Sequence, residues 1–333
     1  MPNIIRRPAW YLPDSAATPQ SLYRDRRRFL KQLGFAGAAA AGLPLAAYAQ
    51  EATTDAPDPE VPAPVKAHGP LPTFETNPTF KDAGRELTDQ KWATQFNNFY
   101  EFGIQKSDPA ANAQGFALDP YTLEIDGLVE NPMKIDLEQI EKLGLEERVY
   151  RFRCVEAWSM TVPWVGVPLH KIIDIAKPTN DAKYVRFETF MDPNRVPGQR
   201  MRAYEWPYVE GLRIDEARNE LTMAVVGLYG ERLLPQSGTP LRIITPWKYG
   251  YKGPKSIVKM SFVDKEPSTF WNDAIPKEYK FYSNVDPKVP HPRWSQASEK
   301  LLGDVVKREP TQWYNGYGEY VAAMYADRKR ELY

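Results

Sequence analysis

The sequence has very little cysteine and histidine: one cysteine, Cys154, and three histidines among 333 residues. One thiol cannot form an internal disulfide, and it excludes zinc and iron–sulfur sites built from several cysteines. The histidines, at 68, 170 and 291, are scattered rather than clustered as in a histidine-rich metal site. The chemistry must therefore come from one thiol, carboxylates, aromatic side chains, and arginines and lysines.

The chain also lacks net charge, because it holds 43 basic and 43 acidic residues. The two signs are not evenly spread. Residues 1–49 hold seven basic and two acidic residues, so the rest of the chain is acidic by five charges. An acidic body gives no electrostatic reason to expect nucleic acid as a partner. The 42% of hydrophobic residues excludes disorder for most of the chain.

No apolar run reaches the ~20 residues that a stable membrane span needs. The run at 34–43 is short and rich in glycine and alanine. Arg26-Arg27 and Phe29 precede it, and Ala47-Tyr48-Ala49 follows it, which is the order of a charged region, an apolar region and a cleavage site. The pattern resembles a twin-arginine signal peptide.

In that signal Asp25 stands where a serine or threonine is usual. We expect residues 1–49 to be a signal peptide that the twin-arginine export machinery reads, with the mature chain delivered folded to the periplasm. Folding before export is typical of proteins that bind a cofactor first. The alternative is an amphipathic surface helix with a basic end.

The mature chain divides into a linker and one large domain. Residues 50–73 are rich in proline and read as a linker, and residues 74–333 are expected to form a single α+β, β-rich domain. Alternation and turn residues predict strands at 121–127, 149–154, 184–190, 241–245 and 256–263. Capping and periodicity predict helices at 137–143, 168–176 and 318–331, the last closing an irregular segment from 264.

Cys154 ends the predicted strand 149–154, on its apolar side. Arg151 and Arg153 alternate with it, and nearby positive charge favours the thiolate, which is the form that ligates metals. The alternative is a buried, inert cysteine that packs as a small hydrophobic residue.

Two further segments suit a ligand. The loop at 247–256 combines glycines with Lys252 and Lys255, close after Arg242, and this mixture suits a phosphate, although it is neither a Walker loop nor a GxGxxG motif. The segment at 95–103 offers amides, a phenol and a carboxylate among aromatics, which suits a flat polar heterocycle. The alternatives are an ordinary hairpin loop and a strand-end turn.

Taken together, these segments resemble the catalytic subunits of periplasmic protein-methionine-sulfoxide reductases, within the sulfite-oxidase superfamily of molybdenum enzymes. The resemblance covers about residues 74–300. It is carried by Asn-Asn-Phe-Tyr-Glu-Phe-Gly at 97–103, Arg-Phe-Arg-Cys-Val-Glu-Ala-Trp-Ser-Met at 151–160, Phe-Glu-Thr at 187–189, Pro-Tyr-Val-Glu-Gly-Leu-Arg at 207–213 and Pro-Trp-Lys-Tyr-Gly-Tyr-Lys-Gly-Pro-Lys-Ser at 246–256.

The resemblance implies a sulfite-oxidase-type molybdopterin-binding fold with one molybdenum, one pterin and Cys154 as the metal ligand. The pterin and phosphate contacts that it implies are Asn97, Tyr100, Glu101, Thr189, Ser237, Arg242, Gly253, Pro254 and Lys255. Ser237 departs from the family pattern, in which we expect an asparagine. Serine has less reach and fewer donors than an asparagine amide.

The implied reaction is oxygen-atom transfer from methionine sulfoxide residues of oxidised periplasmic proteins, a protein repair. The family's usual electron donor is a membrane haem-b subunit fed by quinol. We expect Glu156 and Trp158 to form the catalytic wall beside Cys154, with structural packing as their alternative. Sulfite oxidation, reduction of small S- or N-oxides, and anion binding in the periplasm without catalysis are the alternative functions.

Overall fold

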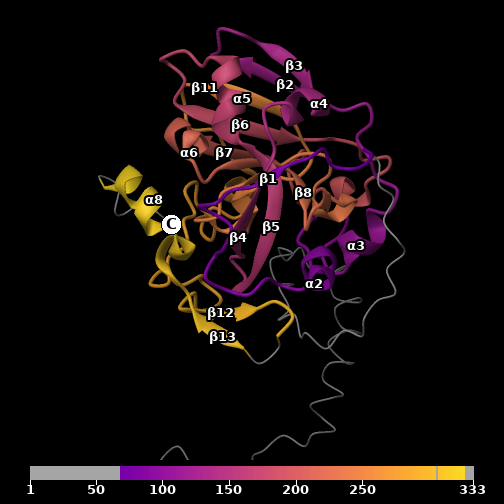
Figure 1. Ribbon diagram of the computed structural model, residues 1–333. Coiled ribbons are helices and arrows are strands. Elements are labelled where there is room, and N and C mark those ends of the chain that lie inside the picture. The colour runs from indigo at the N-terminus through magenta and orange to yellow at the C-terminus, as the bar shows by residue number, and fades with distance from the viewer. Residues whose placement is uncertain (1–67, 305–306, 327–333) are drawn as a thin grey trace, which may run out of the picture. The chain divides into compact units, whose positions relative to one another are not determined.

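Two β-sheets organise the part of the chain that the computed structural model describes, residues 68–304 and 307–326 (Figure 1). The larger sheet contains β1 (Glu75–Thr76), β4 (Glu146–Arg153), β5 (Trp158–Pro168), β8 (Met223–Leu228), β9 (Glu231–Arg232), β10 (Arg242–Ile244), β12 (Ser298–Leu301) and β13 (Arg308–Pro310). The smaller contains β2 (Thr122–Gly127), β3 (Met133–Asp136), β6 (Tyr184–Thr189), β7 (Val209–Arg213) and β11 (Ile257–Val263).

The long strand β5 is the central element of the larger sheet. It pairs antiparallel with β4, from Glu146 opposite Gly166 to Arg153 opposite Ser159. It also pairs antiparallel with β8 and, through its first residues, parallel with β12. The β4–β5 turn, residues 154–157, therefore lies where a strand from the carboxyl-terminal part of the chain joins the sheet.

The smaller sheet has the order β3-β2-β11-β6-β7. In it β11 runs parallel to β2 and antiparallel to β6. The loop before β11 and the end of β6 thus come together, because Ile257 pairs with Thr189.

The helices are short and cover the sheets. They are α2 (Gln90–Gln95), α3 (Asp108–Asn112), α4 (Leu137–Glu141), α5 (Leu169–Ala176), α6 (Ile214–Arg218), α7 (Phe270–Ala274) and α8 (Gly318–Val321), with 3-10 turns at Pro197–Arg200, Pro235–Ser237, Gly250–Lys252, Trp313–Gly316 and Ala322–Tyr325. The largest hydrophobic cluster joins the apolar face of α5 to residues of both sheets.

The expected α+β, strand-rich architecture is confirmed. Each of the five predicted strands is present within one to three residues of its expected ends, as β2, β4, β6, β10 and β11. The capping box of Asp136 and Gln139 opens α4, which ends at Glu141, two residues earlier than expected. The predicted buried face of α5 is present, although Pro168 is the N-cap rather than part of the first turn.

The sequence did not predict β5. Pro163 sits in its middle, and proline within a run argues against a central strand because it donates no ladder hydrogen bond. In the structure Pro163 pairs with Val149, and a bulge follows between Val165 and Gly166. A Cβ on Gly166 would lie 2.3 Å from the Ala224 carbonyl oxygen, so this position requires glycine.

The expectation for the carboxyl-terminal segment was wrong in two respects. The segment from 264 is not merely irregular, because it contains α7 and the pair β12–β13. The helix that was expected from Gly318 ends at Val321, and a 3-10 turn follows to Tyr325. These short turns bury Val321 and Tyr325, and the Tyr325 hydroxyl donates to Glu216 and accepts from Trp247.

The expected signal peptide and most of the expected linker lie outside the described residues. Within the described ranges, no helix is both long enough and apolar enough to cross a membrane.

The core supports a stability prediction. Ile173 on α5 is fully buried, so Ile173→Ala should lower the free energy of unfolding by about 2–5 kcal/mol through lost apolar burial and the cavity left behind. His170→Ala, on the partly exposed side of the same helix, should change it by less than about 0.5 kcal/mol. Denaturant titration of both variants measures this, and equal losses would contradict the assigned face.

Candidate active site

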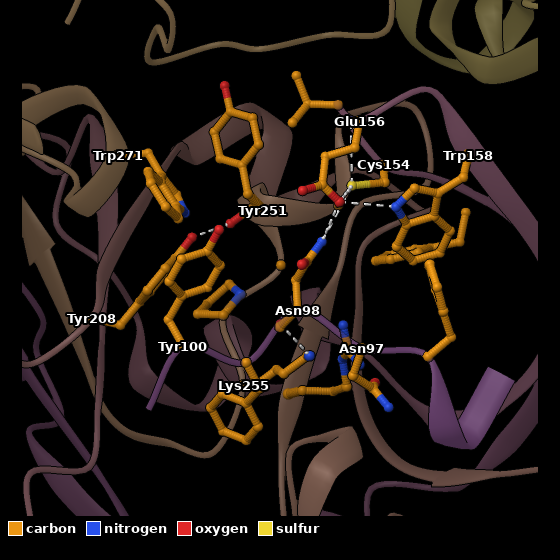
Figure 2. Close-up of a pocket in the computed structure, with 18 of the residues that line it drawn as sticks. Asn97, Asn98, Tyr100, Cys154, Glu156, Trp158, Tyr208, Tyr251, Lys255 and Trp271 are labelled. Atoms are coloured by element: carbon orange, nitrogen blue, oxygen red, sulfur yellow. Dashed lines mark hydrogen bonds between the residues drawn. The ribbon is translucent and has the colours of Figure 1, made fainter. Parts of the chain in front are cut away.

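A pocket whose lining is rich in aromatic side chains contains most of the predicted site residues (Figure 2). Four stretches of chain far apart in sequence, 96–101, 152–160, 250–255 and 271–279, form it together with Tyr208 and Arg242. Of the predicted residues it brings together Asn97, Tyr100, Glu101, Cys154, Glu156, Trp158, Arg242, Gly253, Pro254 and Lys255. Thr189 and Ser237 are not part of its lining.

Cys154 lies in the β4–β5 turn, directly after the last residue of β4. Its N–H donates to the Trp158 carbonyl at 2.9 Å, and its carbonyl accepts from the Ala157 N–H at 3.2 Å. Ala157 has φ +63°, a left-handed conformation that closes the turn. The sulfur is mostly buried but borders the pocket, with the Glu156 N–H at 3.4 Å and Asn98 Nδ2 at 3.5 Å.

We predicted that the neighbouring arginines favour the thiolate form of Cys154. For the protein without a bound metal, this prediction is wrong. Burial raises the pKa of the Cys154 thiol, and the Glu156 carboxylate raises it further, while Lys106 and Arg153 only partly oppose this. Arg153 donates to the Cys154 carbonyl, and Arg151 donates from Nε to the Ala83 carbonyl, so neither guanidinium hydrogen-bonds the sulfur. A bound metal would supply the missing positive charge, since a coordinating thiol is deprotonated outright.

Glu156 is the most densely bonded group at the pocket. Its carboxylate accepts from Lys106 Nζ at 2.8 Å, Asn98 Nδ2 at 2.9 Å and Trp158 Nε1 at 3.0 Å. Burial alone would raise the pKa of Glu156, but the charge of Lys106 and these hydrogen bonds outweigh it and lower the pKa. The carboxylate is therefore ionised at neutral pH, 3.6 Å from the Cys154 sulfur.

Asn98 links this network to the other side of the pocket. Figure 2 shows its side chain pointing toward Cys154 and Glu156, whereas the Asn97 side chain points away from them. The Asn97 amide instead donates to the Thr94 carbonyl at 2.8 Å. Asn98 and Lys106 were not predicted as site residues. Asn98 stood in a recognised motif, but nothing in the spacing of Lys106 connects it to Glu156, 50 residues later.

Two buried cations lie at the pocket without a charged partner. Arg242 is 3% exposed, and burial lowers its pKa to about 9. Lys255 Nζ donates to the Asn98 carbonyl at 2.7 Å, and burial lowers its pKa well below the usual range, with the charge of Arg242 lowering it further. No carboxylate of the described residues forms an ion pair with either cation. Buried charges are normally paired, so this arrangement fits an anionic ligand group such as a phosphate.

Thr189 and Ser237, the two predicted contacts outside the pocket lining, also have polar atoms without hydrogen-bond partners in the described part of the chain. The hydroxyls of Thr189 and Ser237 are buried and have no hydrogen-bond partner among the described residues. The Ser237 carbonyl accepts from Arg242 Nη1 at 2.9 Å, so Ser237 reaches the site through Arg242. Buried polar atoms without partners are rare, and here they fit a polar ligand that the protein alone does not supply.

Glu101 and Tyr100 border the pocket from the segment before α3. Burial raises the pKa of Glu101 to about 7, although Lys255 opposes the shift. Burial also raises the pKa of Tyr100, whose ring packs edge-on against Trp271 at 5.0 Å. Near pH 7 Tyr100 is therefore neutral and Glu101 is about half protonated, so the phenol and the protonated carboxyl can donate hydrogen bonds.

Gly253 lines the pocket and also has a structural role in the loop. A Cβ at this position would lie 2.5 Å from the Ile243 carbonyl oxygen, so glycine lets the loop pack against β10. The next residue, Pro254, accepts from the Ile243 N–H at 3.1 Å. This contact places Lys255 beside the strand that carries Arg242.

The pocket also has an aromatic wall that the sequence analysis did not assign. Tyr208, Tyr251 and Trp271 lie across the pocket from Trp158 (Figure 2), and Tyr279 also lines it. Phe96 packs edge-on against Trp158 at 5.1 Å. Within the described residues, no group of three or more His, Cys, Asp or Glu side chains could hold a metal ion.

Comparison with known proteins places a domain over the middle of the chain. Residues 110–271 match the oxidoreductase molybdopterin binding domain family. Among solved structures, the sulfane dehydrogenase SoxCD from Paracoccus pantotrophus is similar, with a TM-score of 0.39 and 18% identity over 49% of this chain and 42% of that chain. The chain therefore spans less than half of that chain's length. From the family match we conclude that residues 110–271 are an oxidoreductase molybdopterin-binding domain, whose cofactor is Mo-molybdopterin.

Proposed function

We propose that this chain is a reductase of methionine sulfoxide residues in periplasmic proteins. The observation that carries the proposal is that one pocket holds a single thiol, an aromatic wall and the ionised Glu156 carboxylate beside the sulfur. The sequence resemblance to protein-methionine-sulfoxide reductases supports the same reading. The net reaction consumes two electrons and two protons, and converts the sulfoxide to a thioether and water.

The residues of the pocket divide between the metal end and the anionic end of the cofactor. Cys154 would hold the molybdenum, and Arg242 and Lys255 the phosphate. The remaining proposed contacts are Asn97, Tyr100, Glu101, Thr189, Ser237, Gly253 and Pro254. When bound, Mo-molybdopterin supplies the two-electron chemistry that removes oxygen from a substrate.

The aromatic wall suits the methyl thioether end of the substrate side chain. Trp158, held by its hydrogen bond to Glu156 and by Phe96, presents its ring beside Cys154. Sulfur–aromatic contacts contribute about 0.3–1.5 kcal/mol each, so such a wall binds a methionine side chain with little need for charge. Glu156 and Trp158 are thus the residues we propose to orient the substrate.

The charge beside Cys154 favours an uncharged oxide over sulfite. The Glu156 carboxylate lies 3.6 Å from the sulfur and is ionised. Its ion pair with Lys106 at 2.8 Å weakens the repulsion of an anion at this position but does not remove it, because Glu156 lines the pocket beside the sulfur whereas Lys106 is not part of the lining. The Asn98 amide, which lines the pocket and donates to Glu156, is a donor that could instead hold a sulfoxide oxygen. Sulfite oxidation is therefore the weaker alternative.

We also propose export by the twin-arginine route and a membrane haem-b partner that passes electrons from quinol. Both proposals rest on the sequence, because residues 1–49 lie outside the described part of the chain.

The proposal is tested with protein purified from a host that makes the cofactor. With a reduced dye as electron donor, we expect dye oxidation on addition of a protein containing methionine sulfoxide, and methionine as the product. Sulfite with an oxidised dye should give little or no turnover. Faster sulfite oxidation than sulfoxide reduction would overturn the substrate. Protein without molybdenum after growth in molybdate would overturn the enzyme class and favour anion binding.

Replacement of the proposed ligand gives a direct prediction. Cys154→Ser should lower reductase activity per protein at least about tenfold, through lost molybdenum or an inactive centre, because a hydroxyl is a harder and far less acidic donor than a thiol. Met160→Leu, a volume-conserving change in the same lining, should keep its molybdenum. Metal analysis and sulfoxide turnover measure both, and full activity in Cys154→Ser would refute the ligand assignment.

The unpaired cations give a second prediction, with opposite effects on two neighbouring lysines. Lys255→Met should lower the molybdenum-to-protein ratio but leave the melting temperature of cofactor-free protein unchanged or higher, because it removes a buried amine that forms no ion pair with the described residues. Lys252→Met is the matched control. Its Nζ pairs with Glu210, so its loss should destabilise cofactor-free protein by about 3–5 kcal/mol.

Thermal unfolding and metal analysis of the two variants decide between the assignments. If Lys255→Met destabilised cofactor-free protein as strongly as Lys252→Met, the Lys255 ammonium would have a structural partner and the phosphate assignment would fail.

A further inference from the structure

The turn that carries Cys154 is held from behind by a segment far along the chain. The Val155 carbonyl accepts from Trp294 Nε1 at 2.8 Å and from Gln296 Nε2 at 2.7 Å. The Ala157 carbonyl accepts from the Lys300 N–H at 2.9 Å. Two of the four residues in the turn are therefore bonded through their backbone to residues 294–300.

Arg153 connects the same segment to the metal-ligand residue itself. Its guanidinium is fully buried, and Nη1 donates to the Cys154 carbonyl. Nη2 donates to Gln296 Oε1 at 2.8 Å, and Nε lies 3.0 Å from Glu299 Oε2. Both polar atoms of the Gln296 amide are therefore hydrogen-bonded: the oxygen accepts from Arg153, and the nitrogen donates to the Val155 carbonyl.

Glu299 completes the support. It is 1% exposed, and Oε1 accepts from Ser159 Oγ at 2.9 Å and from Arg85 at 2.7 Å, while Oε2 faces Arg153. The buried guanidinium is thus charge-compensated and fixed in orientation. Breaking such a buried pair leaves an uncompensated charge, so the arrangement strongly resists movement.

The turn needs such a support because of its own backbone. Ala157 has φ +63° without being glycine, and it is followed directly by the first residue of β5. A non-glycine residue in the left-handed region persists only where its surroundings over-determine it. Here the Lys300 N–H and the β12–β5 pairing hold Ala157 in place.

We infer that Arg153, Trp294 and Gln296 are positioning residues that fix the direction in which the Cys154 sulfur enters the pocket. Trp294 and Gln296 lie beyond residue 271, outside the matched molybdopterin-binding domain. The support of the ligand is therefore built by the carboxyl-terminal segment, and not by that domain alone. The inference rests on the proposed function only in taking Cys154 as the metal ligand.

The reactivity of Cys154 separates positioning from general stability. Cys154 is the only cysteine of the chain and is 7% exposed, so a thiol-alkylating reagent reaches it when the turn opens locally. The full chain, produced without cofactor, is treated with iodoacetamide under native conditions. This measurement needs neither substrate nor metal, so its failure is distinguishable from failure of the proposed function.

We expect Gln296→Leu to raise the alkylation rate by about tenfold or more, because it removes the donor to Val155 and the acceptor for Arg153. Trp294→Phe, which removes one donor and keeps a ring against His291, should raise it less. Should Gln296→Leu fail to fold, Trp294→Phe alone decides the outcome. In the loaded full chain, the variants should also lose molybdenum faster than wild type during dialysis against a chelator.

Tyr325→Phe is the matched control. It removes hydrogen bonds to Glu216 and Trp247 in another buried part of the carboxyl-terminal segment, and it touches none of the turn. It should lower the unfolding midpoint yet leave the alkylation rate within about twofold of wild type. An equal rise in all three variants, or no rise in Gln296→Leu and Trp294→Phe, would overturn the inference.

Discussion

The structure of the site depends on the burial of two positive charges, Arg242 and Lys255, that no carboxylate of the described chain neutralises. Removing a charge from water is expensive unless a counter-charge or hydrogen bonds replace the solvent. Arg242 has one carbonyl and two aromatic rings, and Lys255 has one carbonyl and one ring. The site therefore holds buried positive charge that forms no ion pair within the described chain, and an anionic ligand group could neutralise it.

Two other buried lysines explain how the loop that carries Lys255 is held in place. Lys248 and Lys252, from the same loop, each form a buried ion pair, with Glu216 and Glu210 respectively. These pairs tie the loop to β7 and α6 and fix its course. Because the loop is held by its internal pairs, Lys255 can stay in place without a partner of its own. The three lysines of this loop look equivalent in the sequence, but Lys248 and Lys252 form structural ion pairs whereas Lys255 lines the pocket.

Features that depend on neighbouring residues could be predicted from the sequence, whereas contacts between residues far apart in the sequence could not. Alternation placed Cys154 correctly at a strand end, since it depends only on neighbouring residues. The same reasoning missed the strand that contains Pro163, because pairing with both neighbours overrides an unfavourable residue. It also expected Arg153 to activate the thiol, whereas the guanidinium is held by distant partners. The contact of Lys106 with Glu156 follows from the fold alone, so no spacing could reveal it.

The bond from Trp294 to Val155 spans 139 residues of sequence. During synthesis the β4–β5 hairpin emerges long before its support exists, and long-range contacts of this kind form late. The thiol therefore acquires its final direction only when nearly the whole chain has been made and folded. A truncated or stalled chain would present an unsupported cysteine. Because the support lies so far along the chain, the proposed metal ligand takes its final position only in a completed protein.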